Sequence, residues 1–469
     1  MGNGLDTENV IYGIVTALAV AVTLVMGWIA YTTPVTPPEK TLRVLTAAAP
    51  DHLKIQRRLN EEYRKVHPDM NVETIAFPYQ SGWRKLQFMI VAGIPPDTTS
   101  IEPPMVPRLI DLGAIEPLDE WIRNDGEFDP SALFPRCMDE GNWDNIQYAI
   151  PANVSPVCLW YNKDLFDKEG LAYPNRDWNL EDLVAAARKL TKDLDGDGIT
   201  DQYGFYTTYS HPNRFPCWVW MMGGEFFTGD QRRCTFDSPA TMRGMKWIAD
   251  LAVKERVMPK WSTLSTISGA SLFISGRLAM TTESRFYLAN FFLEKNRDIV
   301  RKFDWDVCEL PHDKNRATTF VVGLNIIPRT ATPERKKIGW DYIKFLTSET
   351  GQNVIAEMNT ALPARMSAAE KLVHHPGIAP ENDRAFLECI EYGRYLYYPF
   401  PAEAALMDAR TDLMSAWNGN LDPDDVCRKA AYEITKSVDD YFRIHPEGRL
   451  PVKTKWLPFD KRAASPMEP

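Results

Sequence analysis

The sequence predicts an α/β protein with more than one packing unit. Apolar, β-prone segments alternate with amphipathic helical segments, which is typical of a sheet covered by helices. The chain has 469 residues, enough for two or three units at roughly 100–200 residues each. Hydrophobic residues make up 44% and charged residues 25%, an ordinary globular balance. A core of this size needs neither disulfides nor metals to fold.

The first elements after residue 40 carry this alternation. Residues 51–66, for example, place Leu59 and Tyr63 at helical spacing, with charged residues between the apolar ones. We expect strands at 41–48, 71–77 and 98–101, and helices at 51–66 and 82–92. The order predicts a parallel sheet with helices on both faces, and ligands bind such sheets beyond the carboxyl ends of the strands. The loops at 48–52 and 100–104 are therefore candidate walls of a binding site.

Capping residues mark three further helices. Asn179, with Asp182 three residues later, predicts a helix that ends at Leu190. Ser238 and Thr332 each precede a proline at the first helical position. Beyond residue 363 the chain is expected to be helical and aromatic, including EYGRYLYYPF (391–400), before a Pro-rich tail.

The N-terminal region predicts a single-pass membrane anchor. Residues 10–31 contain no charged residue and match the ~20 residues that span a bilayer as a helix. A cleaved signal peptide is the alternative, but residues 1–9 contain Asp6 and Glu8 and no basic residue, whereas a signal peptide begins with a basic region. Residues 32–41 would form a Pro/Thr-rich linker.

Charge and cysteine content limit the partners. The net charge of −10 argues against a nucleic-acid partner, because phosphate contacts need a basic face. The seven cysteines show no C-x-x-C and no zinc-ligand spacing. Cys217 and Cys234 could pair in an oxidising compartment. The interpretation we prefer is that all seven cysteines are independent, mostly buried small hydrophobic residues.

One acidic loop has the spacing of a calcium site. Carboxylates occupy positions one, three, five and nine of a calcium-loop pattern, and Gly198 provides the turn residue at position six: Asp193, Asp195, Asp197 and Asp201. Position twelve is Gly204, where the pattern requires a bidentate Glu. The sequence therefore leaves two interpretations, a weak structural calcium ion or a solvated acidic turn. No other cofactor is expected.

Sequence motifs of enzymes are missing. The chain contains no H-E-x-x-H, G-x-S-x-G, phosphate-loop or G-x-G-x-x-G pattern. Aromatic residues, in contrast, cluster at 203–206, 218–220, 286–287 and 395–400. A sugar site needs flat rings on which to stack the sugar and planar amides or carboxylates for its hydroxyls. Most single aromatic residues lie in a core, but these clusters favour a sugar-binding role for some of them.

The order of several motifs resembles the extracellular solute-binding proteins of ABC importers, of the maltose-binding type. They are GAIEPLDEWI (113–122), YAIP (148–151), LWYNKDLFDKEGL (159–171), WNLEDLVAAARKLT (178–191), LFISGRLAMT (272–281), WDYIKFLTSETGQ (340–352) and LPAR (362–365). The resemblance as a whole covers nearly all of the chain from residue 41 to about residue 443. The N-terminal segment departs from the family pattern, because it has neither the usual basic region nor a lipid-accepting cysteine.

The resemblance implies a two-lobed periplasmic-binding-protein fold that closes around its ligand like a hinge. Three crossings are expected, near residues 150–155, 320–324 and 372–377. Lobe 1 would comprise residues 42–152 and 322–373, lobe 2 residues 153–321 and 374–460, and residues 461–469 a tail. A family member would capture a mono- or oligosaccharide and deliver it to the permease subunits of an ABC transporter. Its binding domain would face the periplasm or the cell exterior.

The family pattern also implies a set of ligand contacts. It places Asp51 and Glu102 on the wall of lobe 1 and Asn153 at the hinge. On the wall of lobe 2 it places Tyr206, Glu283, Phe286 and Tyr398. Carboxylates and the amide would hold hydroxyl groups, and the aromatic rings would stack on the sugar. Trp218 is added from its aromatic cluster alone.

Three alternative functions remain open from the sequence. A phosphorylated polyol would need converging cations, which Arg84, Arg214 and Arg285 could supply. A membrane-anchored carbohydrate-active enzyme would turn over a polysaccharide. A sensory module would present bound sugar to a membrane kinase.

Overall fold

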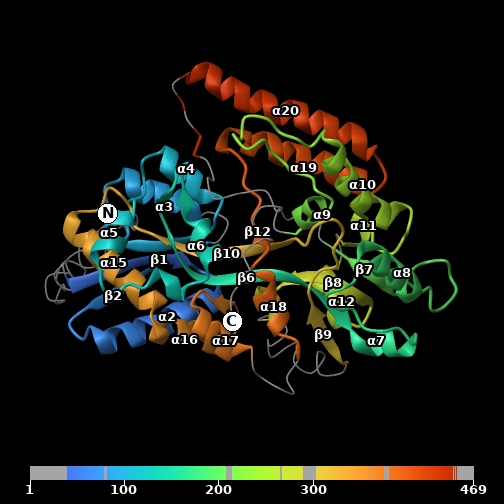
Figure 1. Cartoon of the computed structure of the whole chain (residues 1–469), viewed down its shortest axis with the longest axis horizontal. Coiled ribbons are helices and arrows are strands. Elements are labelled where there is room, and N and C mark those ends of the chain that lie inside the picture. The colour runs from blue at the N-terminus through green and yellow to red at the C-terminus, as the bar shows by residue number, and fades with distance from the viewer. Residues whose placement is uncertain are drawn as a thin grey trace, which may run out of the picture.

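The computed structural model describes residues 40–78, 82–207, 214–264, 267–288, 303–359, 361–373, 380–446, 448 and 450–451. Two lobes lie side by side, and a single mixed sheet of strand order β2-β1-β3-β10-β6-β8-β7 runs through both (Figure 1). The ten strands include β9 and β11, which pair with β6, and β12, which pairs with β10.

The first lobe contains the N-terminal strands and the helices that cover them. Its elements are β1 (Thr41–Ala47), α2 (Pro50–Val66), β2 (Asn71–Phe77), α3 (Gly82–Val91), β3 (Thr98–Ile101), α4 (Met105–Asp111), α5 (Asp119–Asn124), η3 (Pro130–Ala132), α6 (Pro135–Glu140), β4 (Asn142–Trp143), β5 (Ile146–Gln147), α15 (Pro333–Thr347), α16 (Glu349–Glu357), β11 (Leu362–Pro363) and α17 (Met366–Leu372). The strands β1, β2 and β3 are parallel, as the sequence predicts.

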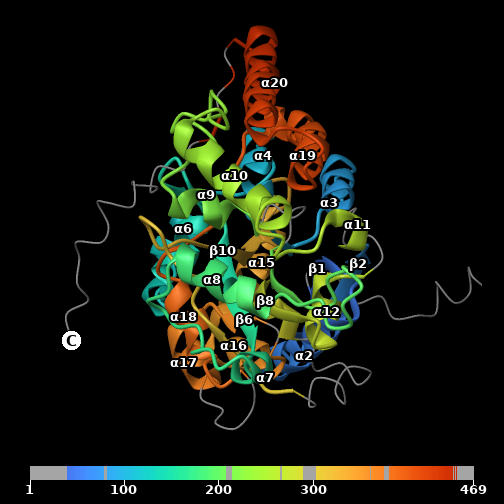
Figure 2. The same cartoon turned by 90° about the vertical axis from the view of Figure 1, so that its right-hand side faces the viewer.

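The second lobe is built on β7, β8 and β9, and two long C-terminal helices pack on it. Its elements are α7 (Lys163–Lys168), α8 (Leu180–Leu190), β7 (Tyr203–Tyr206), α9 (Pro216–Met221), α10 (Pro239–Val253), α11 (Trp261–Leu264), α12 (Gly269–Ile274), β8 (Leu278–Ser284), η4 (Arg285–Tyr287), β9 (Trp305–Cys308), α18 (Arg384–Cys389), β12 (Gly393–Arg394), η5 (Phe400–Ala402), α19 (Glu403–Trp417) and α20 (Pro423–Ile444). Figure 2 shows α20 projecting beyond the rest of this lobe.

Two strands pass from one lobe to the other. β6 (Ile150–Asn162) pairs with β10 (Thr318–Ile326) in antiparallel register through its first half, and with β8 and β9 through its second half. The register of the β6–β10 pair shifts between Gly323 and Leu324. The crossings expected near 150–155 and 320–324 lie on this strand pair. The third lies mostly outside the described residues, so the exact lobe boundaries stay predictions.

Local sequence signals explain where the helices start. Asn179 and Asp182 form a reciprocal capping box at α8, and the side chains of Ser238 and Thr332 cap α10 and α15 ahead of their prolines. Each cap provides an acceptor for an N–H group that has no partner within the helix. The capping residues in the sequence therefore predicted the starts of these helices correctly.

Three expectations need correction or lie outside the described residues. The sheet is mixed rather than parallel, because β10 runs antiparallel to β3 and β6, and β6 also runs antiparallel to β8. The aromatic stretch 391–400 is not helical. It contributes β12, which extends the β10 ladder, and a short irregular segment. The predicted anchor at 10–31 lies outside the described ranges, and within those ranges no helix has both the length and the apolar character needed to cross a bilayer.

Candidate functional site

A buried ion pair lies at the end of β8. The Nη2 of Arg214 donates to Oε2 of Glu283 at 2.8 Å, and the two residues are only 8% and 5% exposed. Burial raises the pKa of Glu283, and the attraction of Arg214 offsets this only in part. The Nε of Arg214 is buried and has no acceptor among the described residues. A buried donor without a partner is costly, and a ligand oxygen would satisfy it.

Tyr287 completes this group from the short helix η4. The Arg214 guanidinium lies 5.3 Å from the centre of the Tyr287 ring. The charge of Glu283 and burial raise the pKa of the Tyr287 hydroxyl. The hydroxyl therefore remains a neutral donor and acceptor. The Glu283 carboxylate, the Arg214 guanidinium and the Tyr287 phenol therefore form one group at the end of β8.

Phe286 links this group to the first lobe. Its ring contacts His52 of α2 edge-on, with ring centroids 5.5 Å apart. Its backbone N–H donates to Oγ of Ser155 in the crossing strand β6 at 2.8 Å. The Phe286 ring is half-buried, so part of it remains available for an apolar ligand surface. The family resemblance implied a place for Phe286 on the wall of lobe 2, and its role in ligand binding stays a prediction.

Arg285 holds η4 in position. Its guanidinium is fully buried and donates to both carboxylate oxygens of Asp383, at 3.0 and 2.7 Å. It also donates to Oδ1 of Asn359, at the end of α16 in the first lobe, at 2.7 Å. Such a bidentate pair fixes geometry as well as charge. Arg285 therefore positions its neighbours Phe286 and Tyr287 and is not a free cation.

Glu102 and Tyr398 form a second group from different lobes. Glu102 follows β3, and burial raises the pKa of its carboxyl. The pKa of Tyr398 is raised to about 12 by burial and by the negative charges of Glu403 and Glu102. Nearby, Arg108 of α4 and Glu403 of α19 form an ion pair at 2.7 Å. Glu102 and Tyr398, which are both predicted wall residues, are therefore close enough for the charge of one to affect the pKa of the other.

Asn153 lies at the crossing, as predicted. It pairs with Gly323 of β10 and with Pro363 of β11. A Cβ at position 323 would lie 2.8 Å from Oδ1 of Asn153, so a larger residue there would displace this amide. Asp51 lies in the first turn of α2, one residue before His52.

Tyr206 and Trp218 are placed in the core instead. Trp218 is completely buried, its ring packs against Trp247 at 5.0 Å, and its indole N–H donates to Oγ1 of Thr207. Tyr206 is 7% exposed, and its ring packs on the backbone of Gly269. Rings that are enclosed in this way offer no free face to a sugar, so the proposed site includes neither Trp218 nor Tyr206. Tyr206 lies on β7, where it pairs with Thr281 of β8.

Several contacts at this site have no signal in the sequence. Arg214 lies 69 residues from Glu283, and the arrangement depends on how the α9 region packs on β8. The sequence had suggested Arg214 and Arg285 only as phosphate ligands, yet each has a carboxylate partner. Arg84 is exposed on α3. For Tyr287, one indication of a role in the site was available from the sequence, namely its place beside Phe286 in an aromatic cluster.

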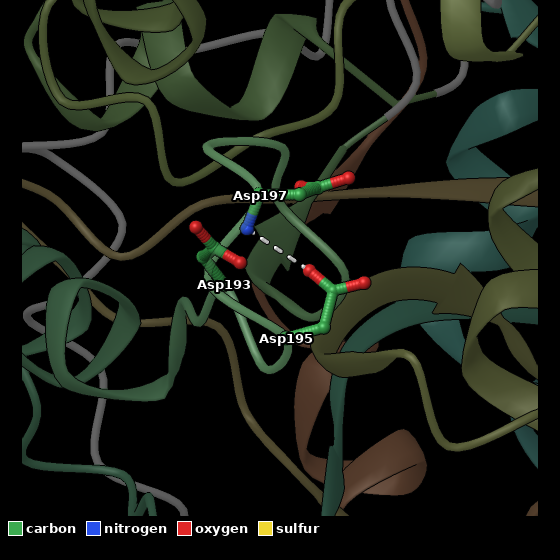
Figure 3. A group of neighbouring side chains, drawn as sticks. All are labelled: Asp193, Asp195 and Asp197. Carbon is green, nitrogen blue, oxygen red and sulfur yellow. Dashed lines mark hydrogen bonds between the residues drawn. The ribbon is translucent and has the colours of Figure 1, made fainter.

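The acidic loop gathers three of its four predicted carboxylates. Ligand atoms of Asp193, Asp195 and Asp197 lie within 4.8 Å of one another (Figure 3). Asp201 is not part of this group, and its Oδ2 accepts from the N–H of Leu194. Both oxygens of Asp193 accept from the backbone, from Gly196 and Gly198, and these bonds lower its pKa. The loop is therefore stabilised by its own hydrogen bonds, and calcium binding stays a prediction.

We expect calcium to stabilise the protein only modestly. With weak affinity and no twelfth-position ligand, millimolar calcium should raise the melting temperature by no more than about 3 °C over chelator. Differential scanning fluorimetry measures this, and Asp195→Asn should abolish the response without changing the melting temperature in chelator. Unfolding in chelator, or nanomolar affinity, would show that the ion is a structural requirement.

All seven cysteines are buried, as expected, and their independence from one another stays a prediction. A pair between Cys217 and Cys234 is not present, and Sγ of Cys217 instead contacts the carbonyl oxygen of Arg214 at 2.9 Å.

A family model described as bacterial extracellular solute-binding protein matches residues 49–353, more than half of the chain. The chain belongs to this family. Among solute-binding proteins, a putative binding protein of Brucella abortus is 23% identical over 391 residues, 79% of this chain and 87% of that protein. An sn-glycerol-3-phosphate-binding periplasmic protein of Rhizobium meliloti is 24% identical over 292 residues, 58% of this chain and 64% of that protein.

Solved solute-binding proteins share the fold. An ABC substrate-binding protein of Listeria monocytogenes, in complex with cycloalternan, superposes with a TM-score of 0.74 at 23% identity, covering 85% of this chain and 99% of that one. The sugar-binding protein MalE of Xanthomonas citri gives 0.72 at 18% identity, covering 87% and 99%. The two-lobed α/β fold is therefore that of a periplasmic binding protein, and the family comprises binding proteins of ABC importers rather than enzymes.

Proposed function

We propose that this solute-binding protein captures a neutral sugar, a mono- or oligosaccharide, between its lobes and delivers it to the permease of an ABC importer. The observation that carries the proposal is the Glu283–Arg214–Tyr287 group beside the half-buried ring of Phe286. A carboxylate, an unsatisfied guanidinium N–H and a phenol can hold hydroxyl groups, while the aromatic face takes an apolar C–H surface. His52 and Ser155 connect this wall to the first lobe and to the crossing strand.

The ion pairs favour a neutral ligand over a phosphorylated polyol. The relative from Rhizobium meliloti is named for binding sn-glycerol 3-phosphate, which makes that ligand class a specific alternative. A phosphate dianion would need cationic groups in excess. Arg214 and Arg285 are each paired with a carboxylate, Glu283 and Asp383. Adding a dianion beside a carboxylate in a desolvated site is unfavourable.

A ligand screen tests this proposal. The soluble portion is heated with a panel of neutral sugars and with sn-glycerol 3-phosphate, and stabilisation identifies the ligand. A ligand at 100 times its Kd adds about 2.7 kcal/mol to the unfolding free energy. Stabilisation by a neutral sugar is the expected result. Release of reducing ends from an added polysaccharide would instead support the carbohydrate-active enzyme, and normal sugar uptake after deletion of the protein would support a sensor.

The N-terminal segment is proposed to anchor the protein to the cell membrane, with the lobes facing the periplasm or exterior. The proposal rests on the uncharged stretch 10–31 beside a polar chain. The full chain should sediment with membranes, and deletion of residues 1–40 should move it to the soluble fraction. A soluble wild-type form with an N-terminus beyond residue 30 would contradict retention and indicate cleavage.

A further inference from the structure

Two cysteines lie in contact behind the candidate site, although 231 residues separate them in the sequence. Sγ of Cys158, in the crossing strand β6, is 3.5 Å from Sγ of Cys389 at the end of α18. Both residues are fully buried. Among the described residues these are the cysteines whose sulfur atoms are in direct contact. Sγ of Cys217 donates to the carbonyl oxygen of Arg214, and the backbone N–H of Cys234 donates to Oγ1 of Thr435.

We propose that Cys158 and Cys389 form a disulfide bond in the extracytoplasmic compartment. The proposal rests on the location of the family outside the cytoplasm, where disulfides form and persist, and does not depend on the identity of the ligand. A disulfide needs its sulfur atoms at about 2.05 Å. The two sulfur atoms must therefore approach by roughly 1.5 Å when the bond forms.

The surroundings keep the two side chains in place. Sγ of Cys389 also lies 3.2 Å from the hydroxyl of Tyr392, and that hydroxyl donates to Oε1 of Glu309 at 2.6 Å. Cys158 is held by the β-ladder, directly opposite Glu283 in the register of β6 and β8. The α18 helix begins beside Asp383, the carboxylate that binds Arg285. The cross-link would therefore tie α18 to the strand that supports the candidate site.

The chemistry is an exchange with an external disulfide, such as that of a dithiol–disulfide oxidoreductase or oxidised glutathione. The thiolate of one cysteine attacks the external disulfide, forms a mixed disulfide and expels one thiol. The second thiolate then attacks the protein sulfur of that mixed disulfide, forms the Cys158–Cys389 bond and expels the second thiol. The protein loses two hydrogens, and the oxidant is reduced to two thiols. Because both sulfurs are buried in the folded chain, the exchange takes place during folding.

The experiment is disulfide mapping of the full chain after export. Cells are quenched in acid, and the protein is unfolded with iodoacetamide and digested for mass spectrometry. Five of the seven cysteines should be alkylated, and a Cys158–Cys389 peptide pair should be present that prior reduction removes. Seven alkylated cysteines would overturn the proposal, and so would a bond between any other pair, for example one that includes the nearby Cys308.

Two variants serve as matched controls. Cys217→Ser removes a buried thiol outside the pair and should retain the Cys158–Cys389 peptide. Cys389→Ser should leave Cys158 alkylatable. If Cys389→Ser fails to fold, the wild-type map alone decides. The oxidised wild-type protein should also melt about 5 °C above its reduced form, because the bond closes a long loop, whereas equal melting temperatures would contradict a formed cross-link.

Discussion

Replacing Arg214 with methionine is expected to lower the unfolding free energy by about 3–5 kcal/mol at neutral pH, because it leaves the carboxylate of Glu283 buried without its partner. Arg214 and Glu283 are both more than nine-tenths buried and are joined at 2.8 Å. Glu283→Gln should also lower the unfolding free energy, because it leaves the Arg214 guanidinium buried without its charged partner. Chemical denaturation measures both variants.

The pH dependence of Arg214→Met provides an internal check. The pKa of Glu283 is raised in the folded protein, so the folded state takes up a proton more readily than the unfolded state. The contribution of this group to stability is therefore present below its unfolded pKa, about 4.3, and is lost as the pH rises through the folded value. Arg214→Met should accordingly lose stability more steeply than wild type between mildly acid and neutral pH.

The double variant separates a coupled pair from two independent residues. Arg214→Met with Glu283→Gln should be more stable at neutral pH than Arg214→Met alone, and its extra pH dependence should disappear. If the changes in unfolding free energy were instead additive and independent of pH, Arg214 and Glu283 would not form a coupled buried charge pair.

Phe286→Ala is expected to weaken sugar binding by about 1–3 kcal/mol, or roughly tenfold to a hundredfold, while leaving the unliganded protein folded. The half-buried ring of Phe286 touches His52 edge-on and retains exposed surface, so its removal mainly takes apolar contact from the ligand. Calorimetric titration gives the affinity, and thermal unfolding without sugar gives the stability.

A second phenylalanine provides the control. Phe303 is also half-buried in the second lobe, but its ring packs on Phe273 in the core at 5.7 Å. Phe303→Ala should lower the melting temperature and leave the affinity of the folded protein unchanged. The contrary result for Phe286, a loss of about 3–5 kcal/mol in unliganded stability with normal affinity, would identify Phe286 as a core residue.

The sequence predicted the local structure well because the signals were local. The caps at Asn179, Ser238 and Thr332 and the periodicity of α2 depend on residues a few positions apart. The mixed sheet did not follow from such signals, since antiparallel pairing of β6 with β10 joins segments more than 150 residues apart. A strand that is buried on both faces shows no alternation that would reveal the direction of its neighbour.

The candidate site was predictable in outline only. The family resemblance implied that Glu283 and Phe286 lie on the wall of lobe 2, and the structure brings Phe286 against His52 of the first lobe. The aromatic cluster suggested Trp218 as well, but a fully buried indole with a satisfied N–H has a core role. Burial cannot be read from residue type. The partner of Glu283 likewise depends on how Arg214 packs, which sequence spacing does not encode.

The affinity ratio for a neutral sugar and its own phosphate ester tests the central claim most directly. Both ligands are titrated calorimetrically into the soluble portion, using the sugar that gives the largest thermal shift. We expect the neutral sugar to bind at one site per chain and its phosphate ester to bind at least tenfold more weakly, because Arg214 is already neutralised by Glu283. Tighter binding of the phosphate ester, or binding of sn-glycerol 3-phosphate with no response to any neutral sugar, would contradict the assignment.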